Sequence, residues 1–271
     1  MSQTQRTIAQ LTDLRGRVAV VIGGAGHLGS AAAHALAELG ADVVIVDMVR
    51  ERAESVAGEL SNLYSVRTLP LVIDLAKEEE VRSVADSVNT QFGRMDVLIH
   101  CAALVGTSAL QGWAVPFSEQ QVGTWRLALE VNLTSAFVLA QTSSAMLTAS
   151  GNGSIILVGS IYGMLGPDWS LYTGTKLGNP AAYAASKGGL SQLTRWLATT
   201  LAPRVRVNGI IPGGIARNQD RAFVDRYVRK VPMSRMATEE DLKGAFVYLA
   251  TDLSRYVTGQ EIAVDGGFSS W

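Results

Sequence analysis

The first hundred residues alternate between short apolar runs and longer segments with helical periodicity. The apolar runs of strand length are residues 17–22, 41–47, 66–74 and 96–102, and helical segments follow the first three. A strand that is apolar on both faces is typical of a parallel sheet buried between two layers of helices. We therefore predict an α/β fold, a Rossmann-type doubly wound parallel sheet with helices on both faces and right-handed crossovers.

The pattern continues in the second half of the chain, which completes a sheet of about seven strands. The further strands are expected at residues 154–159, 204–211 and 261–264. A capping box at Ser118 and Gln121 is expected to open a long helix that runs to Leu147. A second capping pattern, Thr238 with Asp241, is expected to open the last helix.

Composition limits the classes of function that suit this chain. No repeat or linker is present, so residues 1–271 are expected to form one domain, with residues 1–15 as an N-terminal extension. The 23 basic and 24 acidic residues nearly cancel, which gives no electrostatic basis for a nucleic acid or membrane partner. No signal peptide or membrane span is indicated. The single cysteine, Cys101, excludes an internal disulfide and fits a reducing compartment, so we expect a soluble cytoplasmic protein.

Three glycines, Gly23, Gly26 and Gly29, lie directly between the first strand and its helix. Glycines there permit a tight turn and close approach of a pyrophosphate, and the helix N-terminus adds free N–H groups and partial positive charge. Asp47 ends the second strand, where its carboxylate is placed to accept hydrogen bonds from the adenosine ribose. Because that carboxylate would repel a 2′-phosphate and Met48 offers no cation, the pattern predicts NAD as the cofactor rather than NADP.

Tyr183 and Lys187 lie one turn apart at the start of a helix that is predicted from the apolar spacing of Leu190, Leu193 and Leu197. A phenol titrates near pH ~10, which is too high for an efficient acid–base group at neutral pH. A fixed ammonium beside the phenol favours the phenolate and lowers its pKa. A lone Tyr-x-x-x-Lys is usually an ordinary surface pair, but the other motifs of this chain favour the catalytic interpretation.

Taken together, these motifs resemble the short-chain dehydrogenase/reductase family in its compact single-domain form, over essentially the whole chain. The resemblance implies catalytic positions at Asn132, Ser160, Tyr183 and Lys187. It implies cofactor contacts at Gly23, Gly26, His27, Leu28, Gly29, Asp47, Asp74, Leu75, Cys101, Ala102, Tyr183, Lys187, Pro212, Gly213 and Ile215. Family members mostly form dimers or tetramers, so a homodimer or homotetramer is expected. No metal is expected, since the three histidines lack metal-ligand spacing.

The resemblance also implies roles for the catalytic residues in alcohol oxidation. Tyr183 would take the hydroxyl proton as the hydride leaves for the nicotinamide. Lys187 would lower the pKa of Tyr183 and hold the nicotinamide ribose, and Ser160 would hydrogen-bond to the substrate oxygen. Asn132 would position a water that links Lys187 to solvent. Three positions, Ile22, His100 and Arg217, depart from the family pattern and leave their cofactor contacts open.

An insertion between Ser160 and Tyr183 creates a second Tyr-x-x-x-Lys at Tyr172–Lys176. Gly174 and Pro180 cannot sustain a helix through that segment, so we prefer Tyr183 as the acid–base residue. The inserted segment and the stretch 213–230 are similar to oxidoreductases of bacterial flagellin-glycosylation and surface-sugar biosynthesis.

We therefore expect a sugar or nucleotide-sugar derivative as substrate. The polar and aromatic residues of the insertion are Asp168, Trp169, Ser170, Tyr172, Thr173, Thr175, Lys176 and Asn179, and candidate phosphate partners are Arg217, Arg221 and Arg229. The alternatives are a 3-oxoacyl thioester reductase and a generic secondary-alcohol dehydrogenase. A non-catalytic NAD-binding module is disfavoured because both Tyr183 and Lys187 are present. A sugar-nucleotide epimerase or dehydratase is disfavoured because the longer C-terminal substrate domain typical of that class is lacking.

Overall fold

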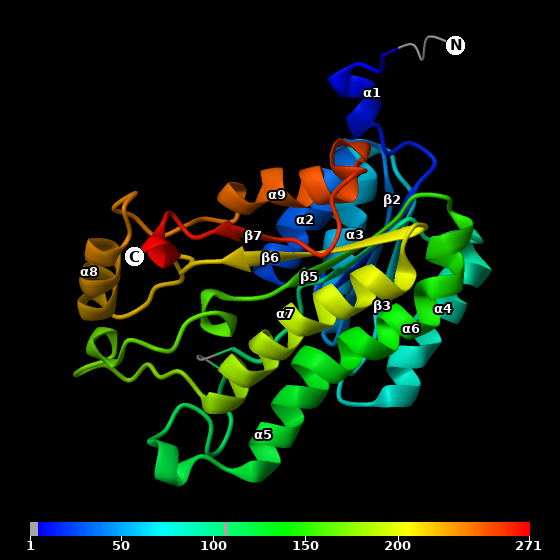
Figure 1. Ribbon diagram of the computed structural model, residues 1–271. Coiled ribbons are helices and arrows are strands. Elements are labelled where there is room, and N and C mark those ends of the chain that lie inside the picture. Colours follow the sequence, from blue (N-terminus) through cyan, green and yellow to red (C-terminus); the bar gives the residue numbers. More distant parts are fainter. Residues whose placement is uncertain (1–4, 106–107) are drawn as a thin grey trace.

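The computed structural model describes residues 5–105 and 108–271 (Figure 1). Within these ranges the strands form one parallel sheet of seven strands in the order β3-β2-β1-β4-β5-β6-β7. The strands are β1 (Val18–Ile22), β2 (Asp42–Asp47), β3 (Thr68–Val72), β4 (Val97–His100), β5 (Gly153–Val158), β6 (Val205–Pro212) and β7 (Glu261–Val264). The predicted doubly wound parallel sheet is therefore confirmed.

Helices cover both faces of this sheet (Figure 1). The α-helices are α1 (Ile8–Thr12), α2 (His27–Glu38), α3 (Arg50–Tyr64), α4 (Glu78–Phe92), α5 (Val122–Leu129), α6 (Ser135–Ala149), α7 (Ala181–Leu201), α8 (Arg221–Lys230) and α9 (Glu240–Ala250). The shorter turns are η1 (Phe117–Glu119), η2 (Glu130–Thr134), η3 (Ile161–Gly163), η4 (Trp169–Leu171), η5 (Asp252–Ser254) and η6 (Phe268–Ser270), of which η2 is a π-helical turn. Among the described helices, none combines the length and the apolar character that crossing a bilayer requires.

Alternate residues of each central strand face opposite helical layers, as the pleat of a strand requires. Ala19 and Val21 of β1 belong to the core that packs on α2, α3 and α9. Val18 and Val20 belong to the core that packs on α4, α6 and α7. All five residues of β1 are buried. The continuous apolar runs in the sequence are thus explained by helices on both faces of the sheet.

The N-terminal segment is docked against the end of the sheet that is remote from the strands' carboxyl ends. Leu14 is fully buried. The guanidinium groups of Arg6 and Arg17 bond to the two carboxylate oxygens of Asp252, at 2.5 and 2.8 Å. These contacts tie the segment around α1 to η5, the turn that follows α9.

The prediction of a single long helix from Ser118 and Gln121 is wrong at its start and in its middle. Residues 117–119 form the 3₁₀ turn η1, and the Gln121 N–H donates to the carbonyl of Gly112 at 3.1 Å. This hydrogen bond holds the chain extended until α5 begins at Val122. The π-helical turn η2, which contains Asn132, then separates α5 from α6.

Only one of the two hydrogen bonds of the capping box predicted for the last helix forms. The Asp241 carboxylate accepts a hydrogen bond from the Thr238 N–H at 2.8 Å. The Thr238 hydroxyl donates to the same carboxylate at 3.2 Å, although a full capping box requires that hydroxyl to accept from the helix N–H. Arg235 also pairs with Asp241 at 2.6 Å, so the carboxylate attracts donors from both residues.

Candidate active site

A cavity of about 1140 Å³ runs along the carboxyl ends of the strands. The strand order places the segments that follow β3, β2, β1, β4, β5 and β6 side by side along this edge. Asp74 and Asp47 therefore lie at one end, the glycine loop lies in the middle, and Ser160 and Pro212 lie toward the other end. Open α/β sheets bind their ligands at such an edge, where the strand order reverses between β1 and β4.

The structure gathers nearly all sequence-predicted site residues around this cavity. The residues that line it include Gly23, Gly26, His27, Leu28, Gly29, Asp47, Asp74, Leu75, Cys101, Ala102, Ser160, Tyr183, Lys187, Pro212, Gly213 and Ile215. Asn132 is the exception among the predicted catalytic residues, because it lies behind the wall.

The loop between β1 and α2 packs tightly against the first turn of α2, and its residues Gly23, Gly26 and Gly29 line the cavity. A Cβ on Gly29 would lie 2.0 Å from the Gly23 carbonyl oxygen, so no other residue fits there unless the loop moves. The helix α2 begins at His27 and so includes Gly29, which was expected to precede it, and its first N–H groups have no partner within the helix. A helix end of this kind attracts phosphate groups. The loop therefore fits the pyrophosphate of a dinucleotide.

At the β2 end of the cavity, the Asp47 carboxylate is held in a fixed orientation. Its two oxygens accept hydrogen bonds from the N–H groups of Ala25 and Val49, each at 3.2 Å. Arg52, which the sequence analysis did not single out, also lines this end of the cavity. The available signal was a cation in the first turns of the helix that follows the second strand.

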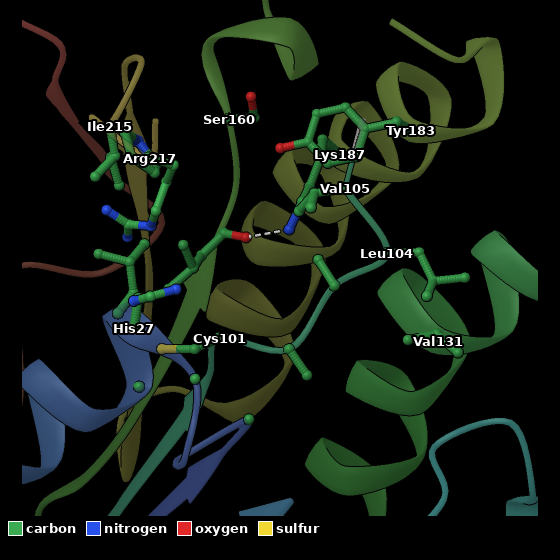
Figure 2. Close-up of a pocket in the computed structure, with 18 of the residues that line it drawn as sticks. His27, Cys101, Leu104, Val105, Val131, Ser160, Tyr183, Lys187, Ile215 and Arg217 are labelled. Atoms are coloured by element: carbon green, nitrogen blue, oxygen red, sulfur yellow. Dashed lines mark hydrogen bonds between the residues drawn. The ribbon is translucent and has the colours of Figure 1, made fainter. Parts of the chain in front are cut away.

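The helix α7 carries Tyr183 and Lys187 on successive turns, as predicted. The Lys187 ammonium donates to the carbonyl of Val158 at 2.7 Å and lies 5.9 Å from the centre of the Tyr183 ring. The turn η3 packs so closely on α7 that a Cβ on Gly163 would lie 2.8 Å from the main chain of Lys187. This close contact brings Ser160 beside α7. Figure 2 shows the side-chain oxygens of Ser160 and Tyr183 near one another, in agreement with the influence of Ser160 on the Tyr183 pKa.

Burial governs the protonation of the Tyr183 and Lys187 side chains. It raises the pKa of Tyr183 above its usual value, while the neighbouring Ser160 hydroxyl opposes the rise. Burial also lowers the pKa of Lys187 to about 8. The predicted lowering of the Tyr183 pKa by Lys187 is therefore wrong. The reason is geometric, since the ammonium is directed at the Val158 carbonyl.

Asn132 is fully buried and bonds to two neighbouring segments. Its side-chain oxygen accepts the Leu104 N–H at 2.7 Å. Its side-chain nitrogen donates to the Leu104 carbonyl at 3.2 Å and to the Ser186 hydroxyl at 3.0 Å. Asn132 thus joins the loop after β4 to α7 and fixes Leu104, which lines the cavity. The water-binding role expected for Asn132 stays a prediction.

His100 and Cys101, at the end of β4, are both kept uncharged. His100 is fully buried with Nε2 2.8 Å from the Ser135 hydroxyl, and burial lowers its pKa to about 3. It does not line the cavity. The Cys101 side chain does, and burial raises its pKa to about 12. Its thiol therefore stays protonated at neutral pH and behaves as a small apolar group rather than a nucleophile.

Arg217 and His27 approach each other above the glycine loop. The Arg217 guanidinium lies 2.7 Å from Oε1 of Glu239, and Nδ1 of His27 lies 3.5 Å from the same oxygen. Both side chains line the cavity, and Figure 2 shows them on one side of it. Glu239 was not identified from the sequence, because it lies outside every recognised motif.

The second Tyr-x-x-x-Lys is not helical. The Tyr172 hydroxyl donates to the Tyr162 hydroxyl at 2.7 Å, whereas Lys176 is exposed in a turn. Of the polar and aromatic residues noted in the insertion, Tyr172 and Asn179 line the cavity. The other six do not line it, because ion pairing of Asp168 with Lys230 fixes the segment to α8. Of the expected polar and aromatic wall, the structure therefore retains Tyr172 and Asn179.

The three candidate phosphate partners also separate in the structure. Arg217 lines the cavity, whereas Arg221 and Arg229 on α8 are exposed and lie outside its lining. Arg221 lies near Asp225 one turn further along the helix, at 3.9 Å. A charged face of α8 therefore accounts for both of these arginines.

One wall of the cavity is apolar. It is formed by Leu104, Val105, Leu110, Leu127 and Val131, which come from the loop after β4 and from the segment α5–η2. Figure 2 shows Leu104, Val105 and Val131 on the side of the cavity opposite Arg217. This wall could not be recognised in the sequence, because its residues belong to two separate segments with no motif.

Comparisons with known proteins show what the whole chain is similar to. A family model described as enoyl-(acyl carrier protein) reductase matches residues 23–269. The cis-4-hydroxycyclohexanecarboxylate dehydrogenase of Sinomonas cyclohexanicum is 35% identical over 260 residues, which cover 94% of this chain and 97% of the relative.

Two solved structures match nearly the whole chain. A short-chain type dehydrogenase/reductase from Mycobacterium marinum has a TM-score of 0.84 at 27% identity, with 97% of this chain and 99% of that chain covered. A gluconate 5-dehydrogenase from Burkholderia cenocepacia J2315, in complex with NADP and tartrate, has a TM-score of 0.84 at 28% identity, with coverage of 98% and 100%.

Proposed function

The chain belongs to the short-chain dehydrogenase/reductase family, and we propose that it transfers a hydride between NAD(H) and a secondary alcohol or ketone of a sugar derivative. One observation carries the proposal: Ser160, Tyr183 and Lys187 meet in the same cavity that the glycine loop opens onto. A nicotinamide bound in this cavity supplies the hydride acceptor or donor. The chain supplies binding, orientation and proton transfer.

Tyr183 exchanges a proton with the substrate oxygen. Ser160 is oriented to assist, because its oxygen accepts the Tyr162 N–H at 3.2 Å and its hydroxyl hydrogen is left for the substrate oxygen. Lys187, anchored on the Val158 carbonyl, would hold the ribose of a bound cofactor. Asn132 acts as a positioning residue for this group, and the water-linked proton path assigned to it is part of the proposal.

NAD is the proposed cofactor because of Asp47. Its carboxylate, fixed by two N–H groups, stands at the strand end where a dinucleotide's ribose is expected. The gluconate 5-dehydrogenase structure contains NADP, and exposed Arg52 gives this cavity a cation of the kind that a 2′-phosphate requires. Solvent screens an exposed arginine more than a half-buried carboxylate, so repulsion by Asp47 outweighs attraction by Arg52.

The sugar-derivative substrate is supported by Tyr162, Tyr172 and Asn179. All three line the cavity, and both amide atoms of buried Asn179 lack a hydrogen-bond partner among the described residues. A buried amide without partners costs free energy. A ring hydroxyl both donates and accepts, so it would satisfy such an amide, and tyrosine faces suit a sugar ring.

The apolar wall of Leu104, Leu110 and Val131 favours a second candidate, a 3-oxoacyl thioester reductase. The matching family model, described as enoyl-(acyl carrier protein) reductase, points the same way. A generic secondary-alcohol dehydrogenase is the less specific form of the same reaction.

A substrate panel separates these candidates. We expect higher kcat/KM with sugar acids, amino sugars, nucleotide sugars or hydroxylated cyclohexane rings than with acetoacetyl thioesters. Asn179→Ala should lower kcat/KM on the best ring substrate and leave the Kd of NADH unchanged, while Lys176→Ala, exposed in the same insertion, serves as the matched control. Efficient reduction of acetoacetyl thioesters without sugar turnover would establish the second candidate. NADH binding without any turnover would indicate a non-catalytic binding module.

A homodimer or homotetramer is the proposed assembly. The apolar side chains of Phe137 on α6 and Trp196 on α7 are exposed beside Leu133 and Leu193 in a shallow groove. Exposed apolar patches of this kind are typical of protein interfaces. Light scattering of the purified chain should give a molecular mass that is a multiple of the 28.8 kDa monomer, and Trp196→Glu should lower that mass.

A reducing cytoplasm is the proposed location, in keeping with the free thiol of Cys101.

A further inference from the structure

We propose that Arg217 binds the cofactor pyrophosphate. On cofactor binding, the Arg217 guanidinium exchanges its ion pair with Glu239 for contacts to the pyrophosphate. The inference rests on the proposed function, because it requires a dinucleotide in the glycine-lined cavity. In this inference the competition between Glu239 and the pyrophosphate for the Arg217 guanidinium sets the affinity for the cofactor.

The position of the guanidinium supports this role. One oxygen, Oε1 of Glu239, contacts both Arg217 at 2.7 Å and His27 at 3.5 Å. His27 is the first residue of α2, so the guanidinium lies close to the helix end where a pyrophosphate is expected. Arg217 and His27 line the cavity, whereas Glu239 is absent from its lining. The Arg217 guanidinium and the His27 ring thus border both the cavity and the Glu239 carboxylate, and Figure 2 shows these two side chains on one side of the cavity.

The main chain at Arg217 is anchored, so its side chain can change partner without moving the loop. The Arg217 N–H donates to the side-chain oxygen of Gln219 at 2.6 Å, and the Gln219 side chain donates back to the Ile215 carbonyl at 2.6 Å. The neighbouring Ala216 N–H donates to the Ala237 carbonyl at 2.9 Å. A long arginine side chain on a fixed main chain can reach a phosphate and form two parallel hydrogen bonds to it.

Electrostatics favour the exchange of Glu239 for a pyrophosphate as the partner of Arg217. Arg217 and Glu239 are both partly exposed, and ion pairs in such surroundings stabilise a protein only weakly. A pyrophosphate offers more negative charge and several acceptor oxygens at the end of α2. After the exchange, Glu239 keeps His27 and its place at the N-cap of α9, where the helix dipole favours a carboxylate.

Binding titrations test the exchange, with NADH, ADP-ribose and adenosine as probes. We expect Arg217→Gln to raise the Kd of NADH and of ADP-ribose about tenfold, since it removes a charge-assisted contact. We expect Glu239→Gln to lower both Kd values about threefold, because the competing carboxylate is gone. Adenosine, which has no pyrophosphate, should bind equally to all variants. In the Arg217→Gln background, Glu239→Gln should lower the Kd of NADH and of ADP-ribose by a smaller factor than it does in the wild type.

Arg235→Gln is the matched control. It removes an arginine–carboxylate pair, Arg235–Asp241 at 2.6 Å, at the same end of α9, and neither residue lines the cavity. Its NADH affinity should match the wild type. Weaker binding in Glu239→Gln, unchanged ADP-ribose binding in Arg217→Gln, or an equal loss for adenosine would each overturn the exchange. A wild-type chain that binds no dinucleotide would instead overturn the proposed function.

Discussion

Exchange of Asp47 for alanine should reduce the preference for NAD over NADP. The carboxylate cannot turn away from a 2′-phosphate, because N–H groups at 3.2 Å hold both of its oxygens. Two unit charges about 4 Å apart interact with about 4 kcal/mol at an effective dielectric constant near 20, and with about 1 kcal/mol in water. Asp47 is half-buried, so an intermediate repulsion of about 2 kcal/mol, or about thirtyfold in kcat/KM, is expected.

The assay is steady-state kcat/KM with each cofactor and one alcohol substrate, at low and at high salt. The wild type should favour NAD by at least about tenfold, Asp47→Ala should narrow the ratio, and Arg52→Ala should widen it. Asp74→Ala, which removes a carboxylate from the neighbouring strand end of the same cavity, should affect both cofactors alike. Equal or better turnover of NADP by the wild type, or an unchanged ratio in Asp47→Ala, would refute the reasoning.

The remaining predictions concern the loop, acid stability and the docked N-terminus. Gly29→Ala should abolish most NADH binding and lower stability by about 1–3 kcal/mol in thermal unfolding, whereas Gly58→Ala, whose Cβ would meet nothing, should leave binding unchanged. Because the pKa of His100 is lowered to about 3 in the folded protein, the stability that its neutral form contributes is fully present above pH 6.5 and is lost as the pH falls toward 3. His100→Gln should therefore make the free energy of unfolding less dependent on pH in this range, by up to about 1.4 kcal/mol per pH unit. Asp252→Ala removes the acceptor of two arginines and should lower the free energy of unfolding by about 2 kcal/mol in urea titrations, with unchanged NADH affinity.

The sheet and most of the cavity edge could be predicted because they depend on local patterns. Buried strands such as Val18–Ile22 must be apolar on both faces, and their carboxyl ends must share one edge once the sheet is parallel. Gly29 could be identified because the turn leaves no room for a side chain. The capping box at Ser118 failed because a two-residue pattern takes no account of the competing hydrogen bond from Gln121 to Gly112.

Contacts between distant segments could not be predicted from local patterns. The partnership of Arg217, His27 and Glu239 joins three elements that only the folded chain brings together. The direction of the Lys187 ammonium, toward Val158 rather than the phenol, depends on how η3 packs against α7. The polar residues of the insertion face outward mainly because Asp168 pairs with Lys230, and nothing in the insertion itself indicates that contact.

The central claim is that Tyr183 is the proton-transfer residue of a hydride-transfer enzyme, and comparison of two phenylalanine variants tests it most directly. Tyr183→Phe removes one oxygen from the side chain, and turnover of the best alcohol should fall at least about 100-fold with little change in the Kd of NADH. Tyr172→Phe, which removes the hydroxyl that bonds to Tyr162, should retain far more activity and act mainly on KM. An inactive Tyr172→Phe together with an active Tyr183→Phe would contradict the account.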